Sequence, residues 1–189
     1  MKEDEVTVHL HKPDASEMVF FFLCGVVTSV PLTLFIYQYT DALLVGLDPF
    51  VIGLISRVVI APLIEEFAKA YPLFYRHGET QRSIFNLAIL VGLGFGLVEM
   101  LTYVSVLDIP LVYRLPGLFF HPASTSLTAY GIATKRPLPF YLLAVFLHLA
   151  NNYFALVSIT PLLASIFVVA TTVFASWYLY NKTEEKIVV

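Results

Sequence analysis

Long apolar runs, separated by short stretches of proline, glycine and charge, dominate the pattern of this sequence. A helix that crosses a bilayer needs about 20 mostly apolar residues. Runs of that length predict about six transmembrane helices, near residues 18–38, 50–75, 83–107, 111–133, 138–158 and 161–180. Because the connections are short, as in RHGETQR at 76–82, the pattern predicts an all-α membrane protein, a polytopic bundle without a second folded domain.

The two ends of the chain are polar. Residues 1–17, MKEDEVTVHLHKPDASE, lack the basic start, apolar core and small-residue cleavage site of a secretory leader. We therefore expect a retained N-terminal tail over residues 1–17, a single transmembrane domain over 18–180 and a C-terminal tail over 181–189.

Basic residues indicate the orientation of the bundle. The connections expected on one side, around 39–49, 108–110 and 159–160, carry no Lys or Arg. Since cytoplasmic loops are enriched in these residues, we expect a multi-pass protein of the cell membrane with both termini in the cytoplasm. The basic residues on that side are Lys2, Lys12, Arg76, Arg82, Lys135, Arg136, Lys182 and Lys186.

Composition supports a membrane protein and excludes some functions. Hydrophobic residues make up 58% of the chain and charged residues 13%, with a mean hydropathy of +0.80. The net charge of −3 is spread over loops and tails and forms no basic stripe, so nucleic acid is not an expected partner. Cys24 is the single cysteine, which leaves no thiol for an intrachain disulfide or a thiolate metal site.

Several charged residues interrupt the apolar runs. The segment APLIEEFAKAYP, residues 61–72, carries two adjacent glutamates and a lysine. A charged side chain in the middle of a bilayer costs about 2.5–3.5 kcal/mol on insertion scales, so such groups are expected to face one another or water. The ionisable residues within the expected spans are Arg57, Glu65, Glu66, Lys69, Glu99, His121 and His148, with Arg114 near an outer end.

Four of these residues are expected at similar depths. Counted from the cytoplasmic end at about 1.5 Å per residue, Glu66 lies about 15 Å deep, His148 about 18 Å, His121 about 21 Å and Glu99 about 25 Å. The hydrocarbon layer is about 30 Å thick. Four helices therefore bring acids or imidazoles to one band, which predicts a single site.

Spacing along the helices suggests roles for the glutamates. Glu65 and Lys69 are four residues apart, so we expect them to pair on one helix face while Glu66 points about 100° away. His148 and Asn152 are also four apart and are expected to face the same ligand. Paired carboxylates in a dry site can act as a general base or acid for water.

The same residue types allow two kinds of hydrolytic site. Carboxylates and imidazoles from separate helices can hold zinc with one open position for water. Asn152 can donate to a developing oxyanion. The candidate metal ligands are Glu66, Glu99, His121 and His148.

The order of these motifs resembles that of the PrsW-type intramembrane peptidases, relatives of the CAAX prenyl endopeptidases and bacteriocin-immunity proteins. The resemblance spans about residues 60–155. It implies peptidase activity on a membrane-anchored protein, with Lys69 in a supporting role, and it leaves zinc-dependent and glutamate mechanisms open. The matching residues are Glu65-Glu66-x-x-Lys69, Phe95-x-x-x-Glu99, His121 and His148-x-x-x-Asn152.

We therefore expect an intramembrane endopeptidase whose catalytic residues come from these motifs and whose partners are a membrane protein substrate and the lipid bilayer. A proton- or cation-coupled carrier could use the same acids as an ion path, but carriers favour internal repeats and none is found. A catalytically silent immunity or scaffold protein of the same fold is a further alternative. The catalytic candidates are Glu65, Glu66, Glu99, His121, His148 and Asn152.

Two other patterns have simpler interpretations. GLGFG at 92–96 lies within an apolar span and follows no strand, which indicates close helix packing rather than a phosphate-binding loop. The hydroxyl residues after His121, beginning with Ser124, lack the turn of a serine nucleophile. We expect them to bond to their own helix.

Overall fold

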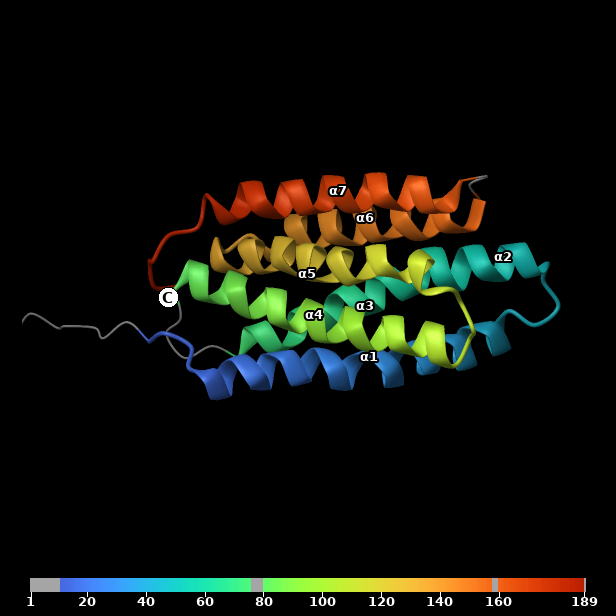
Figure 1. Cartoon of the computed structure of the whole chain (residues 1–189), viewed down its shortest axis with the longest axis horizontal. Helices are drawn as coiled ribbons and strands as arrows, with labels where there is room; N and C mark the ends of the chain where they lie inside the picture. The colour runs from blue at the N-terminus through green and yellow to red at the C-terminus, as the bar shows by residue number, and fades with distance from the viewer. Residues whose placement is uncertain (1–10, 76–79, 158–159, 189) are drawn as a thin grey trace, which may run out of the picture.

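The structure, a computed structural model, describes residues 11–75, 80–157 and 160–188. Within these ranges the chain is helical and forms no strand, which confirms the all-α prediction (Figure 1). The elements in chain order are α1 (Ala15–Leu43), α2 (Pro49–Gly53), the π-helix η1 (Leu54–Ile60), α3 (Ala61–Ala70), the 3₁₀-helix η2 (Tyr71–Phe74), α4 (Gln81–Ser105), α5 (Leu111–Ala133), α6 (Pro137–Val157) and α7 (Pro161–Tyr180).

Four helices of the described chain, α1, α4, α6 and α7, are long and apolar enough to cross a membrane. The two other expected spans, 50–75 and 111–133, are helical as well. The helix α5 is less apolar because its second half is rich in Ser and Thr. These residues are buried against neighbouring helices, since α5 packs on α4, α6 and α7. The total of six spans stays a prediction.

The second expected span is a helical rod that changes type along its length. Asp48 caps its start by accepting a bond from Phe50 N at 2.9 Å, and Pro49 occupies the first turn. Pro62 lacks an N–H and its ring would clash with a carbonyl four residues earlier in an α-helix. Seven residues that end two positions before Pro62 form the wider π-helix η1, and Ala61 N donates to Ser56 O, five residues back. Proline thus accounts for η1, a helix type that is frequent at functional sites.

Glycines allow α4 to approach both of its neighbours closely. A Cβ on Gly92 would lie 2.5 Å from His121 O on α5, and one on Gly94 would lie 2.2 Å from Phe22 O on α1. On α1, a Cβ on Gly25 would lie 1.9 Å from Val91 O. The interpretation of GLGFG as a helix-packing motif is confirmed.

The segment after α7 folds back onto the start of α4. Arg82 Nη2 donates to Thr183 O at 2.6 Å, and Thr80 and Ile187 form an isolated antiparallel bridge. This end of the bundle also holds the start of α1 (Figure 1). Residues 1–10 of the expected N-terminal tail, and Arg76 of the expected cytoplasmic loop, lie outside the described residues.

Candidate active site

The structure brings all the candidate residues together in the interior of the bundle. They come from four helices, among which α3 and α5 contact each other and both of the other two. Each of the two glutamates of α3 is buried, and Lys69 is 0% exposed. The contributions are Glu65, Glu66 and Lys69 from α3, Glu99 from α4, His121 from α5, and His148 and Asn152 from α6.

Lys69 pairs with Glu66. Its Nζ lies 2.7 Å from Glu66 Oε1 and also donates to His121 Nδ1 at 3.0 Å and to Ser124 Oγ at 3.3 Å. All three hydrogens of the ammonium group therefore have partners. The expected pairing of Lys69 with Glu65 is wrong, because His121 and Ser124 on α5 lie on the Glu66 side of Lys69.

The contact with Lys69 sets the tautomer of His121. An ammonium group can only donate, so Nδ1 of His121 must accept and Nε2 carries the proton. Nε2 donates to Glu99 Oε2 at 2.7 Å, and the other oxygen of Glu99 lies 3.1 Å from Arg114 Nη2. Glu99 is thus held between an imidazole and a guanidinium.

Sequence reasoning did not assign a role to Arg114. Its guanidinium carbon lies 3.6 Å from the centre of the Tyr103 ring, so the side chain is fixed by a cation–π contact and an ion pair. Arg114 and His121 are seven residues apart, which places them on one face of α5. The seven-residue spacing from His121 was the feature of the sequence that could have placed Arg114 at the site.

His148 connects the two glutamates. Its Nδ1 lies 2.8 Å from Glu66 Oε1, an ionised oxygen that only accepts, so Nδ1 carries the proton. In the neutral imidazole Nε2 is then an acceptor, and it lies 3.8 Å from Glu65 Oε2. Glu65 Oε2 is itself buried and has no hydrogen-bond partner in the described chain. Two acceptors therefore face each other across a gap that suits a donor of two hydrogens.

Asn152 forms a hydrogen bond that connects α6 with the π-helix η1. Its Nδ2 donates to the backbone oxygen of Arg57 at 2.9 Å. Its Oδ1 accepts from Asn151 Nδ2 at 3.4 Å, and Asn151 Oδ1 accepts from Ser165 Oγ at 2.7 Å. The amide that the sequence predicted as an oxyanion donor is engaged with backbone.

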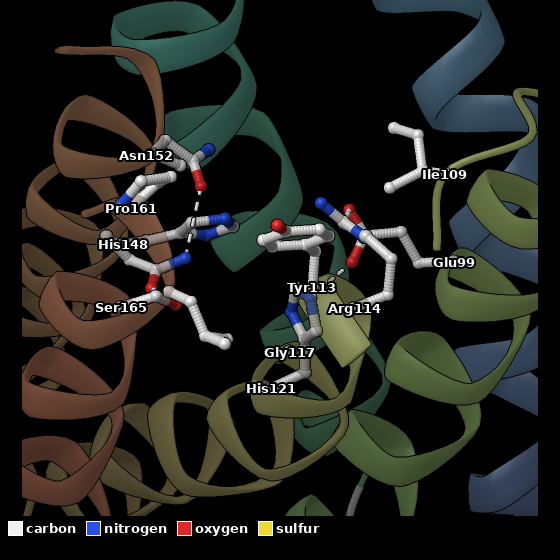
Figure 2. A pocket seen from close by; sticks show the side chains of 13 residues that line it. Glu99, Ile109, Tyr113, Arg114, Gly117, His121, His148, Asn152, Pro161 and Ser165 are labelled. Atoms are coloured by element: carbon white, nitrogen blue, oxygen red, sulfur yellow. Dashed lines mark hydrogen bonds and ion pairs between the residues drawn. The ribbon is translucent and has the colours of Figure 1, made fainter. Parts of the chain in front are cut away.

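A cavity of two adjoining lobes lies beside these residues, with volumes of about 220 and 250 Å³. His121 and His148 line the first lobe, and Glu65 lines the second, while Glu66 and Lys69 line neither. Figure 2 shows the first lobe, with the Tyr113 ring between the His148 side and the pair of Glu99 and Arg114. The residues shared by both lobes are Glu99, Ile109, Arg114, Asn152 and Ala155.

Comparison with known families decides which kind of protein carries this site. The family model of the PrsW family intramembrane metalloproteases matches residues 14–179. The chain belongs to the PrsW family. Searches of curated proteins and of solved structures find no match. Membership supports a hydrolase that cleaves peptide bonds at a membrane.

The PrsW family name implies a metal, so the donors in the site can be tested for one. Glu65 Oε2 and Glu66 Oε2 are buried carboxylate oxygens without hydrogen-bond partners in the described chain, and Nε2 of His148 is an acceptor. Oxygen and imidazole donors of this kind suit zinc. In the described residues no three His, Cys, Asp or Glu side chains already form a converging ligand set. His121 and Glu99 are bonded to each other.

Proposed function

We propose that this PrsW family member is an intramembrane endopeptidase in which Glu65 is the general base. The observation that carries the proposal is the pair of acceptors in the site: Glu65 Oε2, without a hydrogen-bond partner in the described chain, lies 3.8 Å from His148 Nε2. Glu65 also lines the cavity. Glu66 does not line it, and its Oε1 accepts from Lys69, His148 and Ser124.

A water molecule that donates one hydrogen to Glu65 and the other to His148 keeps its lone pairs free to attack. As the water oxygen bonds to the peptide carbonyl carbon, Glu65 takes one proton and the carbonyl π electrons move to oxygen. The C–N bond then breaks, the electrons return to the carbonyl, and Glu65 passes its proton to the leaving amine. The products are a carboxylic acid and an amine, so the proton taken from water is accounted for.

The remaining charged residues hold the base and the imidazoles in position. Lys69 fixes Glu66, and Glu66 orients His148 through Nδ1. Arg114 and His121 fix Glu99, which lines both lobes of the cavity. Buried charges that are paired in this way keep their geometry because each has a hydrogen-bond partner.

A bound zinc ion fits the donors of this site. Glu66 would hold it by Oε2 and His148 by Nε2, in place of the hydrogen bond from His148 to water, which leaves Glu65 as the base. Glu99 and His121 are the further ligands predicted from the sequence. When bound, zinc supplies a Lewis acid that lowers the pKa of water to about 7. Glu65 remains the group beside the peptide bond that accepts the proton.

The substrate is proposed to be a membrane-anchored protein, and the enzyme a multi-pass protein of the cell membrane. The cavity reaches Ile109 and Pro161, which lie at the connections opposite the C-terminal end of the bundle (Figure 1). With cytoplasmic termini, water would therefore reach the site from the outer side. The substrate would approach between helices or through the cavity.

Mass spectrometry of new protein termini tests the proposal without a known substrate. Membranes from cells that produce the wild type are compared with membranes that contain equal amounts of Glu65→Gln. We expect new N-termini within or beside membrane segments only with the wild type. Identical sets of termini from the two folded proteins would contradict it.

A further inference from the structure

The mechanism above does not use Arg57, a charged residue within an expected membrane span. Arg57 lies in the middle of η1 and lines the 250 Å³ lobe together with Glu65. Residues 57, 61 and 65 are spaced by four and all three line this lobe. The arginine therefore shares one wall of the cavity with the proposed base.

Asn152 does not donate into the cavity in this structure. Its Nδ2 bonds to the backbone oxygen of Arg57, and its Oδ1 is held from the other side by Asn151. In the π-helical register the donor to this oxygen would be the N–H five residues later, which Pro62 lacks, so Asn152 supplies a hydrogen bond to η1 where it carries Arg57. Asn152 thus acts on the backbone of a residue that lines the same lobe as Glu65.

We propose that Arg57 contacts the carbonyl oxygen of the scissile peptide bond and that Asn152 is its positioning residue. The proposal rests on the peptidase function proposed above. In the attack step, electrons move from the carbonyl π bond to oxygen, and the guanidinium donates hydrogen bonds to the oxyanion that forms. No proton leaves Arg57, because arginine stays protonated in proteins. A donor placed where charge develops lowers the barrier more than it tightens substrate binding.

The test uses a quenched fluorescent peptide copied from a cleavage site that the wild type produces and Glu65→Gln does not. Removing one oxyanion donor lowers kcat by about 10²–10³-fold. We expect Arg57→Ala to show a loss of this size with KM within about threefold of the wild type. Arg57→Lys should retain part of the activity, and Arg136→Ala, which removes an exposed arginine from a loop, should behave as the wild type.

Chemical rescue separates contact with substrate from a structural role. Truncation at residue 57 enlarges a lobe that already has about 250 Å³, so guanidinium ion can occupy the place of the lost side chain. Millimolar guanidinium chloride should raise kcat of Arg57→Ala at least tenfold and leave the Arg136→Ala control unchanged. Absence of rescue in a folded variant would overturn the contact with substrate.

A double-mutant cycle tests the role of Asn152. If Asn152 acts through Arg57, Asn152→Ala should lower kcat, and the double variant should be no slower than Arg57→Ala alone. Multiplied losses in the double variant would show that Asn152 acts independently and would overturn the positioning role. Activity of Arg57→Ala within threefold of the wild type would overturn the whole inference. If the wild type itself produces no cleavage site, the proposed function fails instead.

Discussion

Replacing Lys69 by methionine removes the only Lys or Arg charge that balances Glu66 through a direct ion pair in the described chain. The ammonium group is fully buried, makes three hydrogen bonds and lies 5.1 Å from the centre of the Phe95 ring. Breaking a buried pair by removing one partner costs about 3–5 kcal/mol. For a chain of this size, each kcal/mol shifts Tm by about 2–4 °C, so we expect Tm to fall by about 6–20 °C.

Circular dichroism is used to monitor thermal unfolding in detergent of the wild type, of Lys69→Met and of the double variant Glu66→Gln/Lys69→Met. The double variant no longer buries an unpaired carboxylate, and its amide oxygen can still accept from His148. It should recover more than half of the lost stability. A single variant within about 1 kcal/mol of the wild type, or a double variant no more stable than the single one, would refute the role of the pair.

Three further changes test other parts of the site. Gly92→Ala places a Cβ within 2.5 Å of a backbone oxygen of α5, so it should lower the free energy of unfolding by about 1–3 kcal/mol. The control is Gly53→Ala, whose added Cβ would have its nearest neighbouring atom at 3.7 Å and which should stay within about 1 kcal/mol of the wild type. Equal effects of the two substitutions would refute the packing argument. Arg114→Met frees one oxygen of Glu99 and should lower kcat about tenfold, with partial recovery in Arg114→Lys; unchanged kcat would show that the ion pair has no role in catalysis. Metal analysis of the purified wild type should find stoichiometric zinc that is lost in His148→Ala; a folded, metal-free wild type would contradict zinc binding.

Hydropathy predicted the helices because each must cover a length of bilayer with apolar side chains. The helices α5 and α7 begin and end where they were expected, and α4 differs by two residues at each end. Hydropathy could not show that 50–75 changes helix type. That change depends on how Pro62 disturbs the backbone before it.

The gathering of the charged residues was predictable because isolated charges are costly in a membrane. Their pairing was not, because spacing along α3 allows Lys69 to reach either glutamate. The choice of Glu66 depends on His121 and Ser124, which belong to another helix. Spacing within α6 likewise placed Asn152 beside His148 but could not show that its amide bonds to η1.

The most direct test of the proposed base compares peptide hydrolysis by purified wild type, Glu65→Gln and Ser124→Ala. The amide introduced by Glu65→Gln keeps the shape of the side chain but cannot take a proton from water, whereas Ser124 is fully buried and does not line the cavity. We predict that kcat falls by at least about 10²-fold in Glu65→Gln and by much less in Ser124→Ala. Wild-type kcat in folded Glu65→Gln would contradict the assignment of Glu65 as the general base.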